Sequence, residues 1–467
     1  MSPTFSSLRV PNYRRYAAGM LVSNTGTWMQ RVAQDWLVLQ LSGNDGTKLG
    51  ITTALQFLPL LLFGLVGGLL ADRFPKRRLL ACTNTFLGLV GLTLGVLVLA
   101  GVAQVWHVYL LAFALGLGTA ADNPARQAFV VEMVDRENLS NAVALNSASF
   151  NAARLVGPGI AGVAIEVFGG TGWVFILNAI TFIAPLIALY SMDPRQLHRT
   201  ELAKRGRGNI REGLRYVRGR PDLLAVLGVV FFAGTFGLNF QITNALMATK
   251  AFHKGAGEYG LLGSVLAIGS LAGTLLAARR KTVRLRLVLV GAAAFGITEF
   301  IAGLMPNYTW YALALPPAGM AALLTMTAAN ATLQLSTVPE MRGRVMSLYL
   351  MVFAGGTPLG APVIGWLADH YGPRWSLLFG GLITATAAVV AAALLARRAS
   401  MTVQAHLRPL PHLEVSRAQS KRARFSLARS AEAIEQVERS EHLHLVPAAT
   451  DAMAPEAAIG AGRGFSP

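Results

Sequence analysis

Cysteine is almost absent from this chain: its 467 residues include a single one, Cys82, so no internal disulfide can form and a metal site is not expected. Charge is also scarce, at 14% of residues, whereas soluble domains carry about 25%. No Gly-Lys dipeptide of a P-loop occurs, and signatures of metalloproteases, serine hydrolases and dithiol redox enzymes are missing as well. We therefore expect neither an enzyme nor a bound cofactor.

Hydrophobic residues, in contrast, make up 53% of the chain, and the mean hydropathy is +0.48. An α-helix needs about 20 apolar residues to cross a bilayer, and twelve such runs are present. The sequence predicts an all-α membrane protein with twelve transmembrane helices. The runs cover residues 14–40, 48–71, 79–101, 105–131, 139–167, 172–192, 223–249, 258–279, 286–305, 309–335, 343–369 and 374–396.

The distribution of Lys and Arg between the loops predicts the orientation. With twelve spans both termini lie on one side, and the loops of that side carry 26 of these residues before the distal tail. The other side has only Lys48, Lys250, Lys254 and Arg374. Cytoplasmic loops are the basic ones, so we expect a multi-pass protein of the cell's inner (plasma) membrane with both termini in the cytoplasm. The net charge of +18 then faces lipid headgroups, and no nucleic-acid partner is expected.

A short pattern, a small residue followed four positions later by an acid, closes every third predicted helix. It occurs at Gly68–Asp72, Gly162–Glu166 and Gly365–Asp369, and Thr274–Ala278 is a copy without the acid. Successive groups of three helices run in opposite directions, so the pattern predicts inverted repeats, the symmetry of secondary transporters.

These repeats divide the chain into four segments. We expect six-helix halves at residues 1–193 and 222–398, a cytoplasmic linker at 194–221, and a cytoplasmic tail at 399–467 that is largely disordered.

The stretch "GGLLADRFPKRR", residues 67–78, is similar to the G-x-L-a-D-R-x-G-R-[RK] signature of the major facilitator superfamily, with Pro75 in place of a glycine. Stretches such as "SNTGTWMQRVAQDWLVLQLSG" and "RGRVMSLYLMVFAGGTPLGAPVIGWLADHYG" resemble its drug:proton antiporter and enterobactin-exporter-like branch. Gly157, Pro158 and Gly162 resemble the antiporter motif G-P-x-x-G-G, with Ala161 replacing one glycine.

This resemblance implies a monomeric carrier that exports a small amphipathic molecule by proton antiport and alternating access. A siderophore exporter of the same fold is an alternative. Another alternative is a transporter-like sensor that does not transport, with the tail from Ala399 to Pro467 as its signalling part.

The resemblance also implies a role for Asp72. A carboxylate near a helix N-terminus is worth about 0.3–1 kcal/mol, and Asp72 would dock on the cytoplasmic start of the eleventh helix in the outward-open form. Four basic residues are candidates to complete this gate: Arg73, Arg77, Arg342 and Arg344. The alternative is that the basic loop only fixes topology.

Charged residues inside the spans are candidates for proton coupling. Arg31 and Asp35 form one i,i+4 pair, and Asp122 and Arg126 form another. We favour Asp35 as the coupling acid, since burial would favour its protonated form and Arg31 its carboxylate; protonation from outside would displace a cationic or amphipathic substrate. Asp122 is the second candidate, and in the alternative interpretation both pairs are structural. Glu299, in a peripheral span, is expected to reach the outer interface.

In the superfamily that the chain resembles, the first, fourth, seventh and tenth helices line the substrate cavity. Candidate cavity residues on these helices and on the fifth are Trp28, Trp36, Arg154, Asn239, Gln241, Asn244, Asn330 and Gln334. For the two tryptophans the alternative is anchoring at the lipid interface.

The orientation gives a first testable prediction. A cysteine introduced at Gly206 should resist membrane-impermeant thiol reagents in intact cells, whereas one at Gly257 should react. The reverse labelling pattern would contradict the predicted topology.

Overall fold

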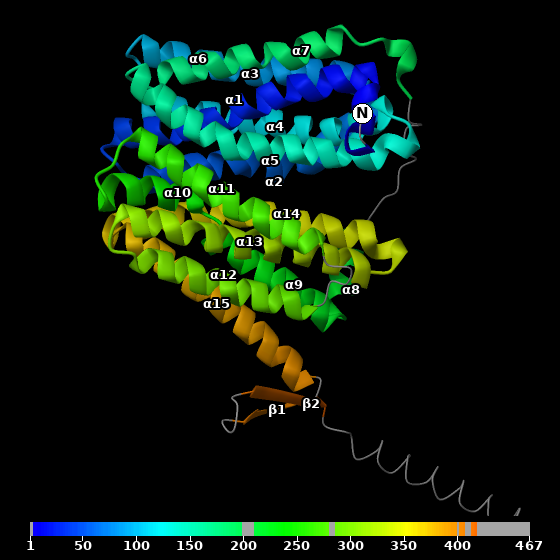
Figure 1. Cartoon of the computed structure of the whole chain (residues 1–467), viewed down its shortest axis with the longest axis vertical. Coiled ribbons are helices and arrows are strands. Elements are labelled where there is room, and N and C mark those ends of the chain that lie inside the picture. Colours follow the sequence, from blue (N-terminus) through cyan, green and yellow to red (C-terminus); the bar gives the residue numbers. More distant parts are fainter. Residues whose placement is uncertain (1–2, 199–209, 280–284, 399–400, 407–411, 418–467) are drawn as a thin grey trace, which may run out of the picture. The chain divides into compact units, whose positions relative to one another are not determined.

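The structure is a computed structural model, which describes residues 3–198, 210–279, 285–398, 401–406 and 412–417 (Figure 1). It divides into two units, residues 1–395 and 396–467. Each predicted apolar run falls on helical structure in the first unit.

The first six runs become seven α-helices, the sixth being divided at Phe182. A short 3₁₀ segment, Pro3–Arg9, precedes α1. Gly43 ends α1 in the left-handed conformation, and the Asp45 side chain accepts a hydrogen bond from the Lys48 N–H to begin α2. The helices are α1 (Pro11–Ser42), α2 (Gly46–Arg73), α3 (Lys76–Leu99), α4 (Val105–Met133), α5 (Arg136–Val167), α6 (Gly172–Thr181) and α7 (Ile183–Tyr190).

The remaining runs follow a connector with a 3₁₀ turn (η2, Pro194–Gln196) and a short basic helix, α8 (Ile210–Arg218). The seventh run is not a continuous helix: α9 (Pro221–Phe232) passes into a π-helix, η3 (Ala233–Gly237), and a break at residues 238–239. It resumes as α10 (Phe240–Leu246) and a second π-helix, η4 (Met247–Ala251). The last five runs form α11 (Ala256–Ala278), α12 (Leu285–Leu304), α13 (Tyr308–Ser336), α14 (Pro339–His370) and α15 (Pro373–Arg398).

Ten helical segments among the described residues are long and apolar enough to cross a membrane. The first and fifth predicted spans, α1 and α5, are helices of 32 residues outside this set of ten. They carry many polar residues, and this composition lowers their mean hydropathy.

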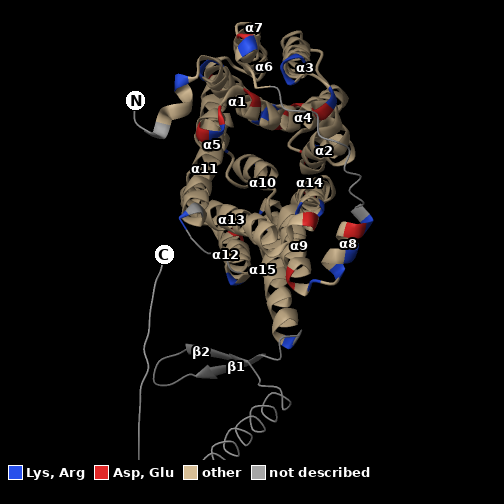
Figure 2. Cartoon of the chain, turned by 90° about the vertical axis from the view of Figure 1, so that its right-hand side faces the viewer, with Lys and Arg blue, Asp and Glu red and all other residues tan. Residues whose placement is uncertain are grey.

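Helices α1–α7, the first half, lie together in Figure 1, and α9–α15, the second half, lie beside them. Short turns make successive helices antiparallel, so the unit has two ends. We call the end where α1 begins and α2 finishes the basic end, and the other the opposite end. Figure 2 views the unit from the basic end, where Lys and Arg mark helix termini and α8.

In the second unit, β1 (Met401–His406) and β2 (His412–Arg417) form an antiparallel pair in which Met401 faces Arg417. The alternation of apolar and polar residues in both segments accounts for the strands.

The structure refines the labelling experiment. A Cβ on Gly257 would lie 2.5 Å from Glu166 Oε1, so a cysteine there would be hindered, whereas Lys254 is exposed. Lys254→Cys is therefore the better site on the opposite end. Cys82 is exposed, so it should be replaced by Ser in the background.

Candidate functional site

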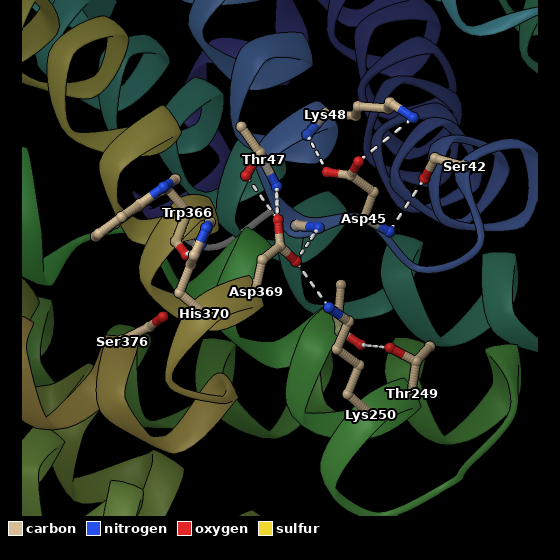
Figure 3. A network of polar contacts seen from close by, with 12 residues as sticks. Ser42, Asp45, Thr47, Lys48, Thr249, Lys250, Trp366, Asp369, His370 and Ser376 are labelled. Atoms are coloured by element: carbon tan, nitrogen blue, oxygen red, sulfur yellow. Dashed lines mark hydrogen bonds and ion pairs between the residues drawn. The ribbon is translucent and has the colours of Figure 1, made fainter.

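Asp369, the penultimate residue of α14, binds the N-terminus of α2 from the other half at the opposite end (Figure 3). Its Oδ2 accepts from the Thr47 N–H at 2.7 Å and from the Thr47 hydroxyl at 2.6 Å. Its Oδ1 accepts from the Gly46 N–H at 2.8 Å and from Lys250 Nζ at 2.7 Å. The first N–H groups of a helix lack partners within the helix, so Asp369 satisfies donors that α2 cannot satisfy itself.

A matching contact joins α5 to α11. Glu166, the penultimate residue of α5, accepts a hydrogen bond at 2.8 Å from the Gly257 N–H in the first turn of α11. The acid in the penultimate position of α5 and of α14 therefore caps a helix of the other half at the opposite end.

The residues of the antiporter-like motif lie at close helix contacts. A Cβ on Gly162 would be 2.7 Å from Ala256 O, and one on Gly157 would be 2.6 Å from the Trp28 Cβ. Pro158 O lies 2.3 Å from where a Cβ of Gly260 would stand. Small residues thus let α5 approach α1 and α11 closely.

The predicted gate residues are not assembled at the basic end. Asp72, Arg73 and Arg342 are exposed. Arg77 donates to the carbonyl of Leu189, at 2.6 Å, and to that of Tyr190, at 3.1 Å, within its own half. Arg344 forms an ion pair with Glu212 of α8 at 3.0 Å. In this structure the acid of the opposite end is engaged and Asp72 is not.

Asp35 is fully buried and binds across the two halves. Its Oδ2 accepts a 2.7 Å hydrogen bond from the hydroxyl of Tyr259 on α11, and its Oδ1 has no hydrogen-bond partner. Trp36 stacks on Tyr259, with ring centroids 6.3 Å apart. Because Tyr259 is 224 residues away in sequence, helix periodicity gave no sign of this partner.

Arg31 and Asp35, four residues apart on α1, form no ion pair among the described residues. Arg31 instead stacks on Trp28 at 4.7 Å from the ring centroid, and Arg154 approaches the same ring at 5.7 Å. Arg31 Nε is buried without a hydrogen-bond partner. Trp28, far from being a lone anchor, is an aromatic surface shared by two guanidinium groups.

Asp122 and Arg126 do form an ion pair, within a wider network. Asp122 Oδ1 accepts from the Thr83 hydroxyl at 2.7 Å and from Asn84 Nδ2 at 3.2 Å. Arg126 donates to Asn24 Oδ1 at 2.9 Å. A carboxylate with this many donors is well satisfied, and the geometry supports the structural alternative for this pair.

The polar candidates of the second half lie in two places. Asn330 and Gln334, which are hydrogen-bonded to each other, line a cavity of about 450 Å³ towards the basic end of α13, together with Tyr349. The candidates on the interrupted seventh span are mostly buried: Asn239 donates to Thr235 O at 2.7 Å, and Asn244 accepts from Tyr311 at 2.7 Å. Gln241 Nε2 is buried without a partner.

Three participants escaped the sequence analysis: Tyr259, Thr47 and Lys250. The sequence did contain a signal for Thr47 and Lys250. The repeated acid pattern singled out Asp369, and the predicted topology places Asp369, Lys250 and the helix start after Asp45 on the same side of the membrane. Tyr259 had no comparable signal.

These features define a polytopic helical membrane protein whose two halves meet through polar contacts between their helices. The family described as "Transmembrane secretion effector", of the major facilitator superfamily, matches residues 2–432. The chain belongs to this family, and it is a multi-pass membrane transporter rather than an enzyme.

Known proteins agree with this assignment. The staphyloferrin A transporter of Staphylococcus aureus is 25% identical over 364 residues, covering 74% of this chain and 87% of that protein. Macrolide efflux protein A of Streptococcus pyogenes is 24% identical over 383 residues, covering 77% and 90%. A bacterial homologue of the human lysosomal transporter Spinster shares the fold, with a TM-score of 0.64 and 15% identity over 85% of this chain and 98% of that one.

The Asp122 network predicts a large effect on stability. Asp122→Ala would leave Arg126 buried without its counter-charge, which should cost about 3–5 kcal/mol of unfolding free energy. We expect a clear fall in the melting temperature of the purified protein in detergent. Asp135→Ala is the control, because its pair with His198 is exposed and should contribute about 1 kcal/mol or less. Equal melting temperatures for the two variants would contradict the network's structural role.

Proposed function

We propose that the protein is a secondary active exporter that moves small amphipathic molecules out of the cell by proton antiport with alternating access. The basic end faces the cytoplasm in this proposal. The main support for the proposal is the Asp35–Tyr259 hydrogen bond. It joins a buried acid of the first half to a helix of the second half, so a change in the charge of Asp35 would affect how the two halves pack.

The two ends support alternating access through one kind of contact. At the opposite end, penultimate acids cap helices of the other half. Asp72 holds the same place in α2, and its counterpart at the basic end would be the start of α14. Closing one end satisfies Asp369 and Glu166, and closing the other would satisfy Asp72. A carrier that alternates between these forms never needs both sets of contacts at once.

In this proposal Trp28 and its neighbours form part of the substrate cavity, and their chemistry would suit an amphipathic substrate. Trp28 offers an aromatic face, and Arg31 and Arg154 add positive charge beside it. On the same face of α1, Asp35 can exchange a negative charge for a neutral carboxyl. Protonation of Asp35 weakens its attraction for a cationic group, which would release such a substrate when the proton comes from outside.

The gate gives a pair of opposite predictions. Asp369→Asn removes charge-assisted hydrogen bonds worth about 1.5–3 kcal/mol, so it should favour the form open at the opposite end by roughly tenfold or more. Asp72→Asn should favour the form closed there. Leu246 is buried beside Gly46. In a protein whose Cys82 has been replaced, Leu246→Cys can therefore report opening of this end. The readout is the rate at which the introduced thiol reacts with a membrane-impermeant reagent in intact cells.

Asp45→Asn is the matched control. Asp45 lies two residues from Thr47, but its side chain contacts Lys48 in the first turn of its own helix and not Asp369. It should leave the labelling rate of Leu246→Cys unchanged. If Asp369→Asn labels no faster than Asp45→Asn, the capping contact does not hold this end closed.

Coupling is tested with Asp35→Asn. Inverted vesicles are given a pH gradient together with ethidium, a macrolide antibiotic or staphyloferrin A. For whichever compound the wild type accumulates, we expect Asp35→Asn to abolish proton-driven accumulation while downhill exchange continues, because the amide cannot carry a proton.

The panel also separates the alternatives. Accumulation of staphyloferrin A alone would favour a siderophore exporter, and failure to move any of these compounds would favour a sensor. If Asp35→Asn still accumulates its compound against a gradient with proton release unchanged, Asp122 becomes the better coupling candidate.

A further inference from the structure

Glu299 is the one buried acid among the described residues of the second half, and the proposed cycle leaves it unused. It was expected at the outer interface, but it is 1% exposed, five residues before the end of α12. Its Oε2 has no hydrogen-bond partner. None of the ion pairs found among the described residues includes it.

Two glycines shape the space around this carboxyl. A Cβ on Gly237, in the π-helix η3, would lie 3.0 Å from Glu299 Oε2 and 2.9 Å from Thr384 Oγ1. A Cβ on Gly380 of α15 would lie 3.0 Å from Glu299 Oε1. The Thr384 hydroxyl is fully buried and also has no hydrogen-bond partner. The carboxyl thus lies between η3 and α15, beside a second unpaired polar group.

The surroundings favour a proton over a metal cation at this carboxyl. The Phe295 ring would lie 2.8 Å from the same Cβ on Gly237. Phe236, the residue before Gly237, packs edge-on against Phe379. Hard metal ions such as Ca²⁺ and Mg²⁺ take about six or more oxygen ligands, which this aromatic surface does not supply. An ionised carboxylate without a cation is strongly disfavoured at such a place. The other titratable group that faces it is Tyr311, whose hydroxyl already donates to Asn244.

The interrupted helix connects this carboxyl to the opposite end. After η3 and the break, α10 and η4 carry Leu246, which packs on Gly46, and Lys250, which pairs with Asp369. Opening the opposite end must move this segment away from α2. Gly237 is the last residue before the break and lies against Glu299. The same movement therefore changes how closely η3 packs over the Glu299 carboxyl.

We propose that Glu299, with Thr384 beside it, is a second proton-binding site, which loads from the opposite side and is occluded by η3 while that side is closed. The proton binds the carboxylate oxygen and is released from it, and no other bond changes. This inference rests on the proposed antiport for its place in the cycle, but occupancy of the site can be measured without any substrate.

The test is infrared difference spectroscopy of the purified full-length chain in lipid nanodiscs during a pH titration. The wild type should show the C=O band of a protonated carboxyl, and Glu299→Gln should remove that band. Thr384→Val should shift its frequency and its titration midpoint. Thr298→Val, next to Glu299, is the control: its hydroxyl bonds the carbonyls of Ala294 and Phe295, so the band should stay unchanged.

A second measurement asks whether the proton exchanges during the cycle. The compound is the one that the wild type accumulates. Glu299→Gln should release about one proton fewer for each molecule of this compound transported, while downhill exchange of the compound continues. Asp35→Asn is measured in parallel.

Three results would overturn the inference. One is a carboxyl band unaffected by Glu299→Gln, and another is a wild-type band abolished by sodium ions, which would indicate a sodium site. The third is an unchanged proton count in Glu299→Gln. Each leaves the proposed function intact when Asp35→Asn alone abolishes coupling. If neither variant changes the proton count, the Glu299 inference fails and Asp122 becomes the coupling candidate; if the wild type itself releases no protons during transport, the antiport proposal fails.

Discussion

The Asp369 carboxylate holds the start of a helix from the other half, and the closed opposite end depends on that contact. Two backbone N–H groups, a hydroxyl and the Lys250 ammonium converge on it. The close approach of α2 and α14 follows, since Gly46 and Gly365 leave room for their backbones to meet. Because the donors belong to a helix terminus, they can be satisfied by water when the halves part. The contact is therefore strong enough to close the carrier and can still be broken.

The sequence allowed the helices and the repeated acid to be predicted, because both are local patterns of apolar length and four-residue spacing. The choice of partners could not be predicted in the same way. Asp35 was paired with Arg31 by helix periodicity, yet it binds Tyr259, a contact that only the packing of the two halves creates. The break after η3 was likewise invisible, since the residues of α9 to η4 are as apolar as a continuous span.

The buried acids differ in how well they are hydrogen-bonded. Asp122 has a guanidinium, a hydroxyl and an amide as donors. Asp35 has one bonded oxygen and one unpaired oxygen, and Glu299 has an unpaired oxygen and no cation. A buried carboxylate needs donors to remain ionised. A fully bonded acid is thus held in one charge state, while a poorly bonded one can change its state at lower cost. This difference supports a structural role for Asp122 and the proposed proton exchange at the other two.

The interrupted seventh span explains how such acids in separate halves can respond together. Gln241 O, just after the break, lies 3.4 Å from the Tyr259 hydroxyl that binds Asp35. Gly237, just before it, adjoins Glu299, and Lys250 at its end pairs with Asp369. A continuous α-helix would transmit movement only as a rigid rod. In the proposed cycle, the break at residues 238–239 lets α10 move with the opposite end while α9 stays packed in its own half. One short segment thus adjoins the Asp369 contact, the Tyr259 partner of Asp35, and Glu299.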